Sequence, residues 1–440
     1  MLYNFMELDR SSSISLTVQL YEALRDAIES RYFEPGENLL SIRQAAVELG
    51  LSRTTIENAY QRLLLEGYVE SRPQSGYKVR SVIPQRREVK VESIPEPIYD
   101  FTTHGMDPGN ADLNNWRRLL RKVLTDVKAV STYGDAQGEP ELREALSSYS
   151  FRARGVATDP ERIFIGAGTG PLLHLLCPLL DRKMPLVIED PGFPLLERIF
   201  SDYGFDVKVV PSDGNFPDDG CSMLASLPSM RARHTAEESL RERNMLKSWL
   251  YETDERYLLE DDYNGELRYR TRPLSSFQAI APDRTIYIGS FSKLLLPSVR
   301  IAYMVLPEEL AGKARLRMSD LNQTAGKTEQ LALAKYIDAG LLEKHLKRLR
   351  RVYQKKSQRL ESAIKKVFGK VEYELLETSL SFAVHFDDGI DMDEIVVKAQ
   401  NEGIAVRKAP GKGNGLLLGF STIAEEDMET ALMKLSDMIG

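Results

Sequence analysis

Within the first eighty residues, apolar side chains recur at helical spacing in three short segments. In the first segment, which is predicted to form a helix, the apolar residues are Leu16, Leu20, Ala23, Leu24, Ala27 and Ile28. Ser41 and Gln44 form a capping-box pattern, which predicts a second helix that runs to Leu49. A third helix is predicted after Ser52, and residues 68–79 have the pattern of two short strands around a turn. This order of elements predicts a winged helix-turn-helix over residues 12–80.

The pattern changes after residue 80. Residues 81–98 are rich in proline and charge without sustained periodicity, and we interpret them as a linker. Over residues 99–440, strand-like apolar runs alternate with helical stretches, which favours an α/β domain with a mostly parallel sheet flanked by helices. The last part of this domain, residues 345–440, is predicted to form a smaller α+β subdomain.

Composition narrows the class of protein. The chain has 440 residues, of which 42% are hydrophobic and 28% charged, as in an ordinary globular protein of two or three domains. No apolar run approaches the roughly 18 residues of a membrane span, and the N-terminus lacks the basic and apolar regions of a signal peptide. The two cysteines and five scattered histidines suggest no metal site. We therefore expect a cytoplasmic protein without a membrane partner.

Positive charge concentrates in the second half of the predicted winged helix. The net charge is −7, yet residues 40–80 carry six basic and four acidic side chains, against three and seven in residues 1–39. The first residues of a recognition helix face base edges, and here these are Ser52, Arg53, Thr54 and Thr55, followed about one and two turns later by Asn58 and Arg62. Arginine and asparagine can make bidentate base contacts, and threonine suits phosphates or a thymine methyl.

The segment LSIRQAAVELGLSRTTIENAYQRLLLEGYVESRPQSGYKV resembles the head of GntR-type regulators. In that family an arginine of the second helix, here Arg43, and the Ser-Arg-Thr run contact DNA. The wing glycine, here Gly76, enters the minor groove. The resemblance implies promoter DNA as a partner. The alternative is a protein-interaction winged helix with a solvated face of arginine and threonine.

The stretch TIYIGSFSKLLLPSVRIAYMV carries the strongest chemical pattern in the rest of the chain. A strand is predicted to end at Gly289, a loop to hold Ser290 and Lys293, and a further strand to begin at Arg300. A Schiff base with pyridoxal 5′-phosphate (PLP) needs one lysine beside a phosphate pocket, for which Ser290 and Arg300 have suitable donors. Lys293 by itself would be an ordinary surface lysine, so the surrounding segments matter.

The segment YLLEDDYNGEL is an apolar strand that ends in acids. PLP requires a carboxylate at its pyridine nitrogen, which keeps the ring protonated and electron-withdrawing. Asp261 and Tyr263 stand 32 and 30 residues before Lys293. The alternative is that the three consecutive acids form a solvated strand end.

Two further segments have chemistry that suits a phosphorylated ring. IFIGAGTGPLLHLL predicts a strand, a Gly-rich turn and a helix start, where Gly168 and Thr169 can offer backbone N–H groups to phosphate. IEDPGFPLLERIF puts Phe193 at a strand end, where it can stack on a ring or belong to the core.

In this order, the segments resemble the aminotransferase-like domain of the MocR/GabR branch of the GntR family, which is related to fold-type-I aminotransferases. The resemblance covers nearly the whole chain and implies that Lys293 forms the Schiff base with PLP. It assigns Asp261 to the pyridine nitrogen, Tyr263 to the ring hydroxyl and Phe193 to ring stacking. Phosphate contacts are implied for Gly168, Thr169, Ser290 and Arg300.

The same resemblance implies a head-to-tail homodimer, because Tyr133 matches the tyrosine that reaches the phosphate of a neighbouring subunit. Two departures concern the effector. Leu195 stands where the family often has an arginine for an effector carboxylate, and the segment 227–234 is altered. Arg407 and Lys412 are both candidates for a second carboxylate-binding residue, and Arg231 can form a new anion site. The effector is therefore left open among an amino acid, an amine and PLP itself.

These features favour a regulator that senses an effector at Lys293 and changes its affinity for promoter DNA. One alternative is an active aminotransferase with a DNA-binding appendage, although Leu195 and the segment 227–234 argue against efficient turnover. Another is a regulator that has lost PLP. Residues 344–359 carry eight basic and no acidic side chains around an apolar seam, so they form either a solvated helix face or a DNA contact.

Overall fold

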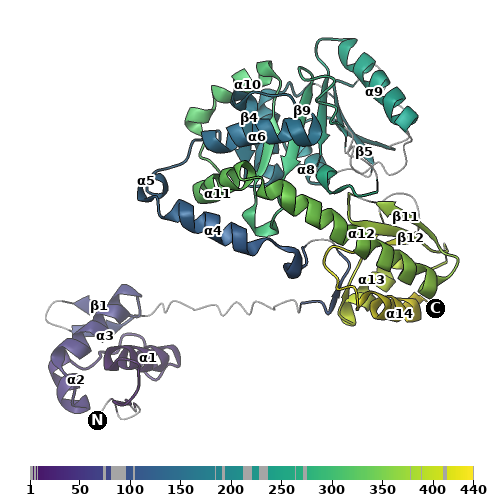
Figure 1. Ribbon diagram of the computed structural model, residues 1–440. Helices are drawn as coiled ribbons and strands as arrows, with labels where there is room; N and C mark the ends of the chain where they lie inside the picture. The colour runs from purple at the N-terminus through teal and green to yellow at the C-terminus, as the bar shows by residue number, and fades with distance from the viewer. Residues whose placement is uncertain are drawn as a thin grey trace. The chain divides into compact units, whose positions relative to one another are not determined.

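The computed structural model (Figure 1) divides the chain into two units, Met1–Ile94 and Pro95–Gly440. It describes all residues except 1–2, 4–5, 7, 73–75, 81–95, 103–104, 184, 191–193, 212–220, 227–235, 263, 271–274, 377, 388, 410–413 and 440.

Unit 1 has the predicted winged helix-turn-helix fold. Its elements are α1 (Leu16–Glu29), α2 (Ile42–Leu49), α3 (Arg53–Leu65), β1 (Val69–Arg72) and β2 (Gly76–Val79). The capping box is confirmed, since the Ser41 side chain accepts from the Gln44 backbone and the Gln44 side chain binds back to the Ser41 backbone. Gly50 ends α2 in the left-handed region at φ +61°, which allows the sharp turn into α3.

The core of unit 1 begins earlier in the chain than residue 12, where the sequence pattern placed its start. Tyr3 is 1% exposed, and its hydroxyl bonds to that of Tyr60 on α3. Its backbone N–H also donates to Glu48 at 2.8 Å. A single aromatic residue has no periodicity, so the sequence pattern could not reveal this contact.

A seven-stranded sheet forms the centre of unit 2. Its strands are β4 (Ile163–Gly166), β5 (Leu186–Asp190), β6 (Val207–Pro211), β7 (Met223–Ser226), β8 (Tyr257–Asp261), β9 (Thr285–Ser290) and β10 (Ala302–Val305). They lie in the order β4-β10-β9-β8-β7-β5-β6, and only β10 runs antiparallel to its neighbours. The predicted mostly parallel sheet is confirmed.

The helices that pack on the faces of this sheet are α6 (Pro140–Arg154), α7 (Thr169–Leu176), α8 (Pro194–Asp202), α9 (Ala236–Tyr251), α10 (Glu308–Arg315) and α11 (Lys327–Asp338). Further from the sheet, α4 (Leu113–Leu124) and α12 (Leu341–Phe368) pack on α11, and α5 (Val127–Val130) packs on α4. Successive residues of β9 enter different cores: Tyr287 packs with residues of α6 and α11, and Ile286 with residues of α7 and α8. This alternation is expected of a strand that is covered on both faces.

A second, four-stranded antiparallel sheet follows α12. It comprises β11 (Glu372–Leu376), β12 (Ser381–His385), β15 (Gly415–Gly419) and β14 (Arg407–Lys408), in that order across the sheet. It is accompanied by α13 (Met392–Asn401), α14 (Met428–Ile439) and the pairing of β13 (Ile404–Ala405) with β3 (Tyr99–Asp100). The long α12 connects the two sheets. No helix among the described residues is long and apolar enough to cross a membrane.

The prediction that Arg300 begins a strand is wrong. A short 3₁₀ turn at Pro297–Val299 redirects the chain, and β10 begins only at Ala302. Arg300 adopts φ +49°, in the left-handed region that non-glycine residues rarely occupy. Such a conformation persists only when its surroundings stabilise it, which directs attention to the contacts of its side chain.

Candidate cofactor pocket and DNA-reading surface

The register of the central sheet brings four sequence-distant segments to one edge. Ala302 pairs with both Gly166 of β4 and Ser290 of β9, so the ends of these two strands flank the start of β10. Asp261, the last residue of β8, pairs with Ile288 of β9. In an open α/β sheet this carboxyl edge is the usual place for a ligand.

Lys293 lies in the turn after β9 and is partly buried. Its pKa falls from an ordinary 10.5 to about 8, first because burial disfavours the ammonium form and second because the positive charge of Arg407 is close. A lysine with such a pKa has a large neutral fraction near pH 8, and the neutral amine is the nucleophile for a carbonyl.

The three consecutive acids at the end of β8 are all buried, so the alternative of a solvated strand end is wrong. Glu260 accepts from the backbone N–H groups of Phe277 at 2.9 Å and Gln278 at 3.0 Å. Asp262 accepts from Arg154 Nε at 2.5 Å and from the Tyr287 hydroxyl at 3.0 Å. Both carboxylates therefore have structural partners.

Asp261 differs from its two neighbours. It is 5% exposed, and no hydrogen bond or ion pair to its carboxylate is found among the described residues. Asp262 Oδ1 is also without a hydrogen-bond partner there, but the other oxygen of Asp262 is held by Arg154 and Tyr287. Burial, with the nearby charge of Asp262, raises the pKa of Asp261 to about 7. A buried carboxylate oxygen without a partner costs free energy, and such a group is expected where a ligand supplies the missing donor.

Gly168 and Arg300 form a cradle at the start of α7. Gly168 has φ +89°, and a Cβ atom placed on it would lie 2.7 Å from Arg300 Nη2. The glycine therefore lets the guanidinium approach the first N–H groups of α7, which begins at Thr169. A helix N-terminus with an adjacent guanidinium is a site for a phosphate.

The remaining predicted pocket residues fall into two groups. Ser290 is described, and its Oγ lies 3.4 Å from Ser292 Oγ and from the Ser292 backbone nitrogen. Leu195, where the family often has an arginine, is 40% exposed on α8. Four predicted residues and the whole segment 227–234 lie outside the described residues; the four are Phe193, Tyr263, Arg231 and Lys412.

The structure also contains supporting residues that the sequence pattern did not indicate. Arg154, at the end of α6, is the cation that neutralises Asp262. Thr324 accepts from the Ala167 N–H at 3.0 Å and so fixes the turn that leads to Gly168. Both contacts join residues more than 100 positions apart, and no local signal marks them.

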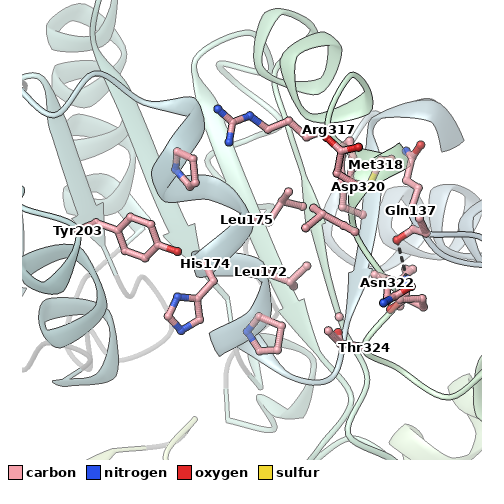
Figure 2. Close-up of a pocket in the computed structure, with 18 residues that line it drawn as sticks. Gln137, Leu172, His174, Leu175, Tyr203, Arg317, Met318, Asp320, Asn322 and Thr324 are labelled. Atoms are coloured by element: carbon pink, nitrogen blue, oxygen red, sulfur yellow. Dashed lines mark hydrogen bonds between the residues drawn. The ribbon is translucent and has the colours of Figure 1, made fainter.

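A cavity of about 800 Å³ lies beside this turn without including Lys293 or Asp261. Figure 2 shows its lining side chains coming from α7, among them His174, and from the segment 317–324, among them Arg317 and Asp320. Thr324 belongs both to this wall and to the support of the Gly-rich turn.

Unit 1 presents most of its predicted DNA-contacting residues to solvent. Arg43, Arg53, Thr54 and Asn58 are exposed, whereas Thr55 is partly buried. Ser52 caps α3 by accepting from the Thr55 N–H at 3.1 Å.

Gly76 opens β2 at φ +77°, and a Cβ atom placed on it would meet no described atom within 4 Å. Arg62, two turns into α3, differs from these residues because its side chain contacts other residues of unit 1. It bonds to Glu66 at 3.0 Å and lies over the Tyr21 ring at 4.0 Å. The exposed group therefore sits at the N-terminal end of α3 and on α2, as in a reading head.

Comparisons with known proteins agree with both units. Residues 16–79 match the family model of bacterial regulatory proteins, gntR family, and residues 105–230 match that of aminotransferase class I and II. The chain is 32% identical to the uncharacterized HTH-type transcriptional regulator YhdI of Bacillus subtilis (strain 168), over 97% of this chain and 96% of that protein.

A second relative is the HTH-type pyridoxine biosynthesis transcriptional regulator PdxR of Corynebacterium glutamicum. It is 28% identical over 97% of this chain and 96% of that protein. Among solved structures, an archaeal alanine:glyoxylate aminotransferase matches with a TM-score of 0.69 and 20% identity, over 78% of this chain and 90% of that one. At that identity the match establishes the aminotransferase fold of unit 2.

Proposed function

This chain belongs to the MocR/GabR branch of the GntR-type transcriptional regulators, and we propose that it binds PLP at Lys293 and uses that site to sense an effector. As in its relatives, the winged helix binds DNA and an aminotransferase-like domain is joined to it. The proposal concerns the cofactor, the residues that hold it and the signal.

The observation that carries the proposal is the unpartnered Oδ1 of buried Asp261. The pyridine N–H of PLP is a donor that would satisfy this oxygen and would stabilise the carboxylate in its charged form. The cradle of Gly168 and Arg300 fits the phosphate, since it combines a helix N-terminus with a guanidinium. Lys293, with its pKa near 8, would provide a neutral amine to react with the aldehyde of PLP. The residues present therefore fit the group.

Each residue has one task in this arrangement. Bound PLP supplies an electrophilic carbonyl and an electron-withdrawing ring to an incoming amine. Lys293 provides the amine that exchanges, Asp261 holds the proton of the ring nitrogen, and Arg300 with the α7 N-terminus anchors the phosphate. Ser290, Thr169, Tyr263 and Phe193 are proposed as further contacts from the family resemblance.

The effector is proposed to be an amino acid, an amine or PLP itself. Arg407, on β14 of the second sheet, supports a carboxylate-bearing effector, because its positive charge helps to lower the pKa of Lys293. At position 195, where the family often has an arginine for an effector carboxylate, this chain has an uncharged leucine. The relative PdxR is by its name a regulator of pyridoxine biosynthesis, which keeps PLP among the effectors to be tested.

A direct test is to add PLP to the full-length protein, reduce it with borohydride and map the modified peptide by mass spectrometry. We expect a pyridoxyl group on Lys293, a visible absorbance band before reduction, and loss of both in Lys293→Ala. The matched control, Lys313→Ala, removes an exposed lysine that pairs with Glu309 and should keep both signals. A label that persists in Lys293→Ala would refute the assignment.

Sensing is tested by titrating amino acids, amines and PLP while the DNA affinity and the visible spectrum are followed. A regulator shows a change in affinity that disappears in Lys293→Ala. Sustained transfer of the amino group to a 2-oxo acid, without any change in DNA affinity, would favour an active aminotransferase instead.

We also propose a head-to-tail homodimer. Tyr133 is fully exposed in the single chain, although its backbone carbonyl accepts from Lys327 Nζ at 3.4 Å. An exposed tyrosine on a fixed backbone suits a contact with the phosphate site of a second copy. Light scattering should give twice the chain mass, and Tyr133→Ala should weaken PLP binding without changing that mass.

A further inference from the structure

A group of basic side chains on unit 2 has no role in the pocket. On α4 the exposed residues include Arg117, Arg118, Arg121 and Lys122, and this helix contains no acidic residue. Its opposite face is buried through Trp116, so the four cations share the solvent side.

The first half of α12 continues this pattern. Its exposed cations recur every three or four positions at Lys344, Lys347, Arg348 and Arg351. The apolar seam predicted for residues 344–359 is confirmed, because Leu346, Leu349 and Tyr353 are buried on the other side.

The start of α4 lies close to α12, and both helices pack on α11. Arg348 Nη2 of α12 donates to the carbonyl of Asn110, three residues before α4, at 2.6 Å. Tyr336 of α11 donates to Asp112, directly before α4, at 2.7 Å. In Figure 1 the two helices run along the same side of unit 2. We call the eight residues Arg117, Arg118, Arg121, Lys122, Lys344, Lys347, Arg348 and Arg351 the basic surface.

The basic surface has little compensation from acidic neighbours. Within the described residues, none of its eight members forms an ion pair, and the nearby Glu343 is bound by Arg152 at 3.0 Å. The charge of Arg348 does act on Asp112, whose pKa it helps to lower. The second half of α12 is different: Lys355 pairs with Glu425 at 2.9 Å, Lys365 with Glu361 at 3.0 Å, and Lys366 with Glu429. One helix thus carries compensated cations at one end and uncompensated cations at the other.

We propose that the basic surface binds the phosphates of double-stranded DNA that flanks the sequence read by the winged helices. Eight exposed cations without ion pairs, in a chain of net charge −7, suit a polyanionic partner, and DNA is the polyanion that unit 1 brings close. Five of the eight are arginines, which bind phosphate through two parallel N–H donors.

The length of the connecting chain allows this contact. Residues 81–95 join the two units, and 15 residues span at most about 50 Å when fully extended. That length corresponds to roughly 15 base pairs of duplex at about 3.4 Å each. The flanking DNA is therefore within reach of unit 2 while unit 1 is bound.

The test compares two fourfold variants of the full-length protein. The surface variant carries Arg117→Gln, Arg121→Gln, Lys347→Gln and Arg351→Gln. The matched control loses the same charge from the compensated half of α12, through Lys355→Gln, Arg359→Gln, Lys365→Gln and Lys366→Gln. The probe is a labelled mixed-sequence duplex of about 60 base pairs, and its binding is measured by anisotropy between about 50 and 200 mM KCl.

Each lost phosphate contact lowers the slope of log K against log [KCl] by about 0.9, so the surface variant should lose about 3 to 4 units of slope. The control should keep the wild-type slope to within about one unit. Equal slopes in all three proteins would overturn the proposal. A surface variant with an altered mass in light scattering would also overturn it, because the surface would then be an interface between copies of the chain.

Folding of each variant is checked by circular dichroism. If the fourfold variant does not fold, Lys347→Gln with Arg351→Gln provides a smaller test, with an expected loss of about 2 units of slope. An unchanged slope in that pair would equally overturn the proposal.

Discussion

The candidate DNA-reading surface and the candidate cofactor pocket are built in different ways. In unit 1 the candidate side chains, Arg43, Arg53 and Asn58, come from two adjacent helices and remain in water. In unit 2 they come from the ends of β4, β8 and β9 and from the turn before β10. Asp261 is buried and Lys293 partly buried, whereas Arg300 is exposed.

This difference has an energetic consequence. Exposed arginines cost the folded protein little before DNA arrives. Burial shifts the pKa values of Asp261 and Lys293 toward neutrality, so the pocket reduces the stability of the empty protein. Substitutions should therefore separate the two regions, since those in the pocket change folding and those on the surface change only binding.

The largest effect is expected for Asp262→Asn in the cofactor-free protein. It removes the carboxylate that forms the buried ion pair with Arg154, which should lower the free energy of unfolding by about 3–5 kcal/mol. Both tryptophans lie in unit 2, so urea unfolding followed by tryptophan fluorescence reports on this unit. Asp338→Asn, at an exposed position, is the control and should change stability by less than about 0.5 kcal/mol. A loss below about 1 kcal/mol in Asp262→Asn would contradict the assigned role.

Asp261→Asn should raise the free energy of unfolding of the cofactor-free protein, whereas Asp262→Asn should lower it. The folded protein holds a proton on Asp261 up to about pH 7, whereas the unfolded chain releases it near 3.8, so this carboxyl lowers stability as the pH rises through that range. Removing it should raise the free energy of unfolding at pH 8 by on the order of 2–4 kcal/mol, and the gain should shrink toward pH 4. The same variant should bind PLP more weakly. If cofactor-free Asp261→Asn were less stable than wild type at pH 8, the interpretation of Asp261 as an unpartnered carboxylate would be wrong.

Arg53→Ala should change binding alone. Loss of a bidentate base contact is expected to weaken binding to DNA selected from a random pool by about 1–3 kcal/mol, with stability changed by less than about 0.5 kcal/mol. Arg62→Ala is the counterpart on the same helix, because its contacts to Glu66 and Tyr21 are internal. Arg62→Ala should lower the stability of the protein more than its DNA affinity. A larger loss of DNA affinity than of stability would contradict the different roles assigned to Arg53 and Arg62.

The smallest effect concerns Arg407 and Lys293. The rate at which the cofactor-free protein attaches PLP should rise with pH around a midpoint near 8, where the Lys293 amine loses its proton. Arg407→Gln removes a positive charge that disfavours the ammonium form, so the midpoint should move upward by roughly half a pH unit. Lys408→Gln, whose partner is Asp393, should leave it unchanged. A midpoint near 10.5 in the wild type would show that Lys293 is not buried as the structure has it.

Much of unit 1 could be predicted from the sequence because its signals are local. The capping box at Ser41 and the glycine turn at Gly50 act within a few residues. Tyr3 was missed since its contact with Tyr60 joins distant positions.

The pocket could be predicted only in part. Sequence patterns identified Lys293 and Asp261 as candidates, and the family they resemble is confirmed. The surroundings of Arg300 were not predicted correctly, because its strand begins two residues later and its backbone is left-handed.

By itself, the sequence determined the two-part organisation, the winged helix, the mostly parallel sheet and the order of the pocket segments. Tertiary structure decided which of the three acids 260–262 lacks a partner, that the Arg300 guanidinium meets Gly168, and that Arg407 acts on Lys293. The physical reason is the distance along the chain between the residues that interact. Helix caps and turns are made by neighbouring residues, whereas a pocket at a sheet edge depends on the register of strands such as β4 with β10 and β8 with β9, whose paired residues lie more than twenty positions apart.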